Sequence, residues 1–224
     1  MKSAKKYIGM LLISGMVFST SCNSWNSTAK GGAIGAGSGA AIGGILGNKS
    51  GNTAEGAILG AAIGGVTGAA IGRYMDKQKE KLEQDLGNSA DVERVGEGIL
   101  VTFDSGILFD FDSDDLNKDV RNELDNFSET LNEYEDTEIE VKGYTDSTGS
   151  KNYNLELSQE RAQSVRNYLG GLGIDYNRMK VEGLGESNPV ATNDTPEGRE
   201  QNRRVEIAIF ANDELKQKAE NGEI

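Results

Sequence analysis

Glycine recurs at every fourth position across residues 31–72, and this spacing constrains the N-terminal part of the chain more than any other feature. Two runs keep the period, one at Gly31, Gly35, Gly39, Gly43, Gly47 and Gly51, the other at Gly56, Gly60, Gly64, Gly68 and Gly72. A period of four places the glycines on one face of an α-helix, where they leave a groove that lets a second helix approach closely. We therefore predict a helical hairpin in residues 31–72, with helices at 31–47 and 56–72.

The residues between these glycines are mostly small or aliphatic, and only Lys49 and Glu55 are charged. A flexible glycine-rich linker is the simplest alternative, but the regular period and the interleaved Ile, Leu and Ala argue against it. Each helix would be about 25 Å long, slightly short of the roughly 30 Å hydrocarbon core of a bilayer. Because glycine costs about 1 kcal/mol against alanine in a helix, these helices need packing partners or lipid. The pattern fits both membrane contact and self-association.

The first 22 residues have the layout of a secretory signal peptide. Basic residues at the start precede 12 apolar residues, 7–18, which are too few for the about 20 that span a bilayer. The single cysteine, Cys22, follows where bacterial lipoproteins have their acylation site, although those motifs usually carry Leu at the position of Ser19. We expect a signal peptide at 1–21 and a lipidated linker at 22–30. Cleavage without lipidation of Cys22 is the alternative.

Composition excludes several classes of function. The net charge is −13, and an acidic surface repels phosphate backbones, so we expect no nucleic-acid partner. The chain has no histidine, which removes Ser-His-Asp and Cys-His catalysis and the usual zinc sites. We expect no metal and no cofactor. A mean hydropathy of −0.50 argues against a protein with many membrane spans.

Residues 73–91 are highly charged with few apolar positions, and they predict a helical spacer. From about residue 92 to 211, strand and helix signals alternate. Strands are expected at 98–103, 137–144, 179–185 and 203–210, with helices at 113–134 and around 155–169. The order β-α-β-α-β-β predicts an α+β domain in two layers, with the helices on one face of the sheet. The tail at 212–224 is polar and is expected to be solvated.

One charge breaks the apolar side of the helix around 155–169. Arg161 lies between Leu157 and Val165 at steps of four. A buried arginine needs an anionic partner, because an unpaired buried charge costs several kcal/mol. Asp146 lies in the loop "YTDSTGS", which joins the preceding strand to this helix and should lie near the helix N-terminus. Asp146 and Arg161 either neutralise each other or bracket a ligand that carries both charges, such as an α-amino acid group.

Three segments resemble the signature sequences of the OmpA-like peptidoglycan-binding domain, in order and in approximate spacing over some 110 residues. They are "VKGYTDSTGS", "YNLELSQERAQSV" and "NPVATNDTPEGREQNRRVEI". The N-terminal part is similar as well. An acylation cysteine, a glycine-zipper repeat and "RYMDKQKEKL" before such a domain resemble one group of outer-membrane lipoproteins.

The resemblance implies non-covalent binding of the peptidoglycan stem peptide through the free amino-acid end of diaminopimelate. The family motifs assign Asp146 to the ammonium and Arg161 to the carboxylate. Asn154 matches the Asn before "LS", which orders the loop or touches the ligand, and Arg203 matches a residue that closes the pocket. Asp112 lies where the family's first loop lines the site. Tyr144 departs from many members, which have His, and its role is expected to be packing.

These features favour a lipid-anchored protein of the outer membrane whose periplasmic domain tethers the membrane to peptidoglycan. A membrane-associated assembly or motor-stator component with a similar domain is the alternative, but the apolar N-terminal stretch is short and Glu55 falls in the polar connection between the helices. An enzyme acting on the cell wall is a third hypothesis. Its paired carboxylates would be Asp110 and Asp112, which at this spacing more often cap a helix or face water. We expect no catalysis.

Overall fold

The computed structural model describes residues 53–110 and 112–224. The expectations for the signal peptide, for lipidation at Cys22, for the linker and for the first glycine-rich helix lie outside the described residues. No helix within the described part of the chain combines the length and the apolar character needed to cross a membrane.

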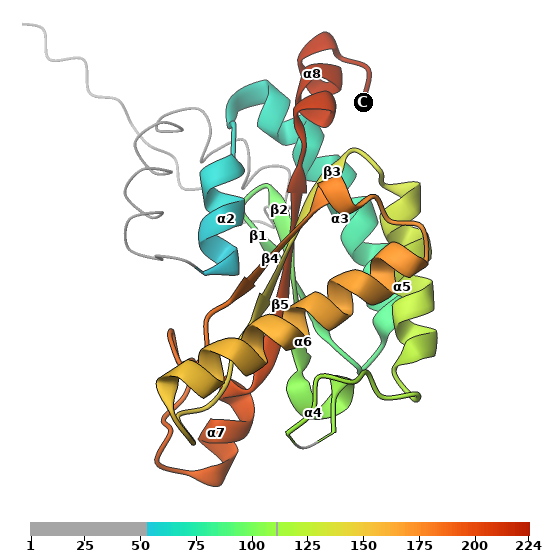
Figure 1. The fold of residues 1–224 in the computed structure, drawn as a ribbon. Coiled ribbons are helices and arrows are strands. Elements are labelled where there is room, and N and C mark those ends of the chain that lie inside the picture. The colour runs from blue at the N-terminus through green and yellow to red at the C-terminus, as the bar shows by residue number, and fades with distance from the viewer. Residues whose placement is uncertain (1–52, 111) are drawn as a thin grey trace, which may run out of the picture.

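A five-stranded mixed sheet forms the centre of the described fold (Figure 1). The strands are β1 (Asp91–Val95), β2 (Gly98–Asp104), β3 (Thr137–Gly143), β4 (Met179–Gly183) and β5 (Arg204–Ala211), in the spatial order β1-β2-β5-β3-β4. Strands β3 and β4 are parallel, because helix α6 (Lys151–Gly171) makes the crossover between them, and the other pairs are antiparallel. The prediction of an α+β domain is confirmed, and the four predicted strands correspond to β2, β3, β4 and β5. The sequence analysis missed β1, which forms a hairpin with β2.

The two faces of the sheet are covered by different helices. Apolar residues at alternate positions, such as Val101, Val141 and Ile207, join one core with helices α3 (Gly65–Leu86), α5 (Arg121–Glu133) and α6. On the opposite face, Leu100 and Ala208 pack against the short helix α2 (Ala54–Ala61). Figure 1 shows α2 on one side of the sheet and α5 and α6 on the other. Shorter elements complete the fold, namely α4 (Ser105–Leu108), η1 (Tyr176–Arg178), α7 (Pro196–Asn202) and α8 (Asp213–Asn221).

The predicted single helix at 56–72 is two helices, α2 and α3, with a break at residues 62–64. Gly64 and Gly65 adopt φ angles of 75° and 73°, in the left-handed region that glycine tolerates best. The carboxylate of Glu97, in the turn between β1 and β2, accepts hydrogen bonds from the backbone N–H groups of Ile63 and Gly64 at 2.7 and 2.8 Å. A Cβ atom at Gly68 would lie 2.0 Å from this carboxylate. This glycine therefore makes room for a side chain that binds the start of α3.

The interpretation of 73–91 as a spacer is wrong, because α3 continues to Leu86 and packs into the core. Met75 and Leu82 have no exposed surface, and they form a narrow apolar stripe with Ile71 and Leu86 along one side of the helix. The tail is not fully solvated either. It folds into α8, whose Leu215 is buried in the same core.

The predicted helix at 113–134 begins only at Arg121. The residues between α4 and α5 form a loop closed by a hydrogen bond from the backbone N–H of Asn117 to the carbonyl of Leu108. This loop, and not a helical turn, borders the candidate site described below.

Replacing Leu82 by Ala tests whether α3 is part of the folded domain. We expect the free energy of unfolding to fall by about 2–5 kcal/mol, since the substitution leaves a cavity in the core. Denaturant unfolding followed by circular dichroism would measure it. Lys77, which is exposed on the same helix, supplies the matched control as Lys77→Ala and should change stability little. Equal stability of the two variants would contradict the packing role of α3.

Candidate functional site

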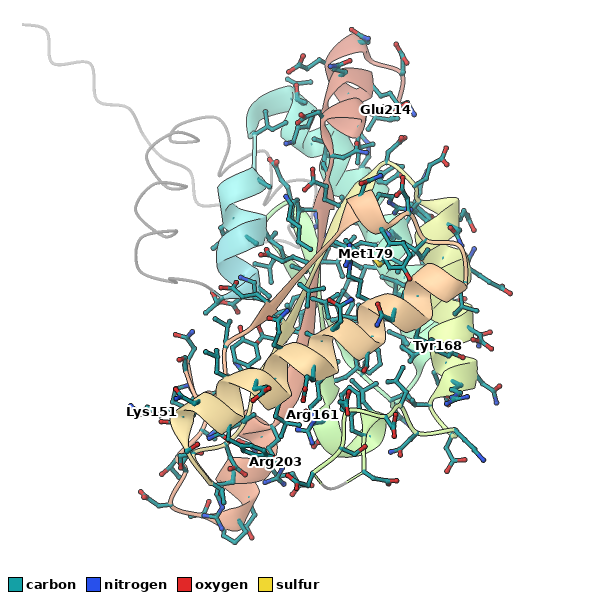
Figure 2. The ribbon with its side chains drawn as sticks, in the orientation of Figure 1. Lys151, Arg161, Tyr168, Met179, Arg203 and Glu214 are labelled. Carbon is teal, nitrogen blue, oxygen red and sulfur yellow. The ribbon has the colours of Figure 1, made fainter. Side chains whose placement is uncertain are left out.

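A cavity of about 630 Å³ opens at the end of the sheet where β2 and β3 finish and β5 begins. Loops after β2 and β3 and the first turns of α6 and α7 surround it. All five residues predicted from the sequence line this cavity, namely Asp112, Asp146, Asn154, Arg161 and Arg203. Figure 2 shows the labelled Arg161 and Arg203 close together beside the N-terminal half of α6.

Close contact between α6 and the sheet positions the site. A Cβ atom at Gly143, the last residue of β3, would lie 2.1 Å from the backbone oxygen of Ser158, and one at Gly183, the last residue of β4, would lie 2.4 Å from the nitrogen of Gln159. The two glycines therefore let α6 cross directly over the strand ends. Ser150 caps the helix by accepting a hydrogen bond from the N–H of Tyr153. This arrangement brings the first three turns of α6 to the rim of the cavity.

Arg161 is a buried guanidinium whose terminal nitrogens have no protein acceptor in the described part of the chain. Only 5% of the residue is exposed. Its Nε donates to the carbonyl oxygen of Ser113 at 2.9 Å, and the guanidinium lies 5.3 Å from the centre of the Phe109 ring. Burial lowers its pKa, but an arginine stays charged at neutral pH. Within residues 53–110 and 112–224, no carboxylate lies within ion-pairing distance, so Nη1 and Nη2 are available for an anion.

Asp146 forms its ion pair with Arg203 and not with Arg161. One carboxylate oxygen accepts from Nη1 of Arg203 at 2.7 Å, and the other accepts from the backbone N–H of Thr148 at 2.7 Å. Burial would raise the pKa of Asp146, but these hydrogen bonds outweigh it and hold the pKa below its ordinary value of 3.8. The carboxylate is therefore ionised at neutral pH. The possibility that Asp146 and Arg161 neutralise each other is not what the structure shows.

Asn154 and Asp112 hold the two loops on either side of the cavity. The Asn154 amide donates to the backbone oxygen of Asp146 and to Oε2 of Glu186, both at 3.2 Å. Asp112 has a positive φ of 58° and accepts a hydrogen bond from the Tyr153 hydroxyl. That bond raises the pKa of Tyr153, and burial adds to the shift. Asn154 therefore fixes the Asp146 loop, while Asp112 links the loop before α5 to α6.

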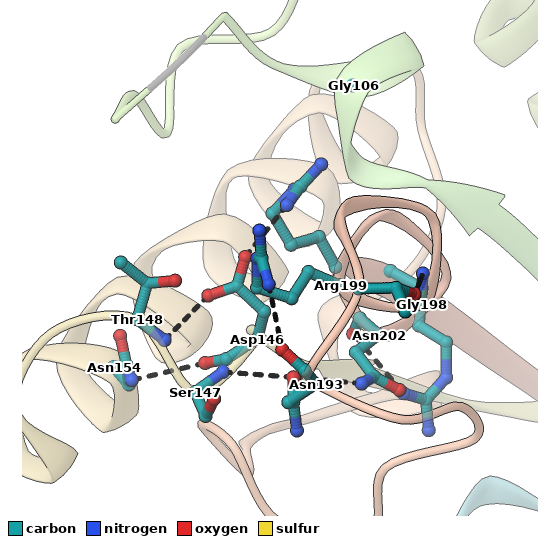
Figure 3. A network of polar contacts seen from close by, with 12 residues as sticks. Gly106, Asp146, Ser147, Thr148, Asn154, Asn193, Gly198, Arg199 and Asn202 are labelled. Atoms are coloured by element: carbon teal, nitrogen blue, oxygen red, sulfur yellow. Dashed lines mark hydrogen bonds and ion pairs between the residues drawn. The ribbon is translucent and has the colours of Figure 1, made fainter.

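Helix α7 supplies residues that the sequence analysis missed. Arg199 lines the cavity and donates from Nη1 to the carbonyl oxygen of Asn193 at 2.8 Å. The Asn193 side chain accepts from the N–H of Ser147 and from the amide of Asn202, as the dashed lines of Figure 3 show. The signal was present in "TPEGREQN", where Thr195 caps a helix with Pro196 at its start and places Arg199 and Asn202 one turn apart.

Tyr144 does not line the cavity. It is completely buried on the face of the sheet that α2 covers, where its hydroxyl donates to Oε2 of Glu206 at 3.0 Å. The guanidinium of Arg204 stacks 3.7 Å from the centre of its ring. Burial, followed by the charge of Glu206, raises the pKa of the Tyr144 hydroxyl. Its contacts are those of a packed, hydrogen-bonded side chain, as expected from the sequence.

Comparison with protein families matches residues 108–203 to the OmpA family and residues 1–76 to the YMGG-like Gly-zipper. The sequence is 42% identical over 136 residues to "Probable lipoprotein YiaD" of Escherichia coli. The alignment covers 60% of this chain and 62% of that protein. It is 43% identical over 86 residues to peptidoglycan-binding protein ArfA of Mycobacterium bovis, covering 38% of this chain and 26% of that protein. The chain thus spans less than two thirds of either relative.

Among solved structures, the cell wall anchor of the T6SS from Pseudomonas aeruginosa is similar in fold. The TM-score is 0.54 and the sequence identity is 31%. The alignment covers 60% of this chain and 99% of that chain.

Removing the Arg203 guanidinium should raise the pKa of Asp146. In Arg203→Met the strongest hydrogen bond to the carboxylate is lost while burial remains, so the pKa should move upward. A carboxyl-carbon NMR titration measures this directly. A lowered pKa stabilises the native state above pH 3.8 and the contribution is lost as the pH falls through the folded-state value, so the variant should also lose part of this stability. Arg166→Met, outside the cavity, serves as the control, and an unchanged Asp146 midpoint would contradict the assignment.

Proposed function

We propose that this chain, whose residues 108–203 match the OmpA family, binds peptidoglycan without covalent linkage and tethers a membrane to the cell wall. The ligand is the stem peptide, held at the free amino-acid end of diaminopimelate. Two of the compared proteins support this proposal by description, one as a peptidoglycan-binding protein and the other as a cell wall anchor.

The observation that carries the proposal is the juxtaposition of a buried cation and an ionised acid in one open cavity. Arg161 offers Nη1 and Nη2, which match the two oxygens of a carboxylate as a bidentate pair. Asp146 keeps acceptor capacity beyond its bonds to Arg203 and Thr148, since a carboxylate can accept about four hydrogen bonds. A zwitterion fits both charges at once, with its carboxylate on Arg161 and its ammonium on Asp146.

The remaining predicted residues position these two. Arg203 holds the Asp146 carboxylate, Asn154 fixes the backbone of the same loop, and Asp112 borders the cavity from the loop before α5. We assign them support of the site and closure around the ligand. We propose binding at this cavity and no hydrolysis of the wall, because two of the compared proteins are described as a peptidoglycan-binding protein and as a cell wall anchor.

The membrane end of the tether is the N-terminal segment. We propose that Cys22 carries a lipid that anchors the chain in the outer membrane, with the OmpA family domain in the periplasm. The similarity to a protein described as a lipoprotein supports this. Between Cys22 and Thr53 lie 30 residues.

Sedimentation with insoluble peptidoglycan tests the wall-binding site. We expect Arg161→Ala and Asp146→Ala to lose most of the bound fraction, with the affinity falling on the order of 100-fold for Arg161, because charge-assisted hydrogen bonds contribute about 1.5–3 kcal/mol each. Arg166→Ala is the matched control, since Arg166 lies on the same helix but bonds to the carbonyl of Tyr176 outside the cavity. If Arg161→Ala sediments as well as the parent, the site is wrongly assigned.

Incorporation of radiolabelled palmitate tests the anchor. The parent chain should be labelled and should fractionate with membranes, whereas Cys22→Ala should take up no label, because the only thiol of the chain is gone. Equal labelling of the two proteins would exclude Cys22 as the lipidation site.

A further inference from the structure

The charges that line the cavity are unevenly paired. Asp146 pairs with Arg203, and Asp112 accepts from Tyr153. Arg161 and Arg199 line the same cavity, and neither has a carboxylate within ion-pairing distance among the residues that the structure describes. Asp110 also lines this cavity, but among the described residues no ion pair joins it to either arginine, so both guanidiniums can bind an anionic ligand. Arg161 is accounted for by the proposed function, and Arg199 is not.

Arg199 is held in place by the backbone around it. Its Nη1 donates to the carbonyl oxygen of Asn193, which leaves Nε and Nη2 without an acceptor in the described residues. Gly198, the preceding residue, is packed so closely that a Cβ atom there would lie 2.0 Å from the oxygen of Thr192. Asn202, one turn later, is fully buried and bonds to both Ala191 and Asn193. The guanidinium therefore extends from a fixed turn toward the cavity.

We propose that Arg199 binds a second carboxylate of the ligand, so that the cavity selects stem peptides in which diaminopimelate carries two free carboxylates. This inference rests on the proposed function. Diaminopimelate has an amino-acid group at each end. The outer end supplies the zwitterion for Asp146 and Arg161, and the other end supplies a free carboxylate only where the stem terminates at this residue. Conversion of that carboxylate to an amide removes its charge and its match to a guanidinium.

Calorimetric titration of the full chain with two synthetic tripeptides tests the inference. Both are L-Ala-γ-D-Glu-diaminopimelate, one with a free C-terminal carboxylate and one with a carboxamide at that position. We expect the parent chain to bind the acid about tenfold more tightly than the amide, since a charge-assisted hydrogen bond is lost. In Arg199→Gln the acid should weaken to the level of the amide, while the affinity for the amide stays the same. Arg199→Lys keeps the positive charge but loses the planar guanidinium that can donate two parallel hydrogen bonds. Part of the preference for the acid over the amide should therefore persist in this variant.

The outcomes separate this inference from the function on which it rests. Arg166→Gln, outside the cavity, should keep the parent's preference for the acid. Equal binding of acid and amide by the parent, with no change in Arg199→Gln, would overturn the role of Arg199 while leaving peptidoglycan binding intact. Absence of binding of either peptide to the parent would refute the proposed function itself. Amide-proton NMR spectra of both Arg199 variants show whether the fold is retained, and a loss of acid binding in a folded variant supports the inference.

Discussion

The close approach of α6 to the ends of β3 and β4 is the constraint on which the site depends. Gly143 and Gly183 end these strands, and any side chain there would collide with the backbone of Ser158 and Gln159. Because the helix lies this near, its first three turns supply Asn154 and Arg161 to the cavity while its later turns complete the core. The same helix thus contributes to stability at one end and to recognition at the other, and a shift of its axis would disturb both.

Asp146 and Arg161 could be predicted from residues close together in the sequence, whereas Asn154, Arg203 and Asp112 were expected only from the family resemblance. Arg161 interrupts an apolar stripe, and Asp146 lies in the adjoining loop, so a shared location follows from local geometry. The actual partner of Asp146 is Arg203, which lies 57 residues further along the chain. Such a pairing depends on how β5 is inserted between β2 and β3, which local patterns do not encode. Arg199 is different, because the local signal of a capped short helix was present and only its position at the cavity depends on the fold.

The predictions about the fold that were wrong concern segments whose charged or glycine-rich composition was given more weight than the positions of their apolar residues. Residues 73–86 carry many charges, yet Met75, Leu82 and Leu86 continue the apolar stripe that begins at Ile71, and this stripe is enough for the helix to pack into the core. In the glycine repeat, the period of four predicted a groove for another helix. The described half instead uses Gly64 and Gly65 to break the helix and Gly68 to admit the Glu97 carboxylate. The regular glycine period therefore indicated that another group packs closely against the helix, but it did not indicate whether that group is a second helix or a side chain.

The position of α2 has a mechanical consequence. It lies on the face of the sheet opposite the main helical layer, and its apolar contacts are made mainly by Ala54 and Ile58. A pull on the chain upstream of Thr53 would load this small patch first, away from α6 and the cavity. Eight residues span about 12 Å as a helix and about 27 Å when extended. Peeling off α2 would therefore lengthen the connection by roughly 15 Å before tension reached the end of α3 that Glu97 holds.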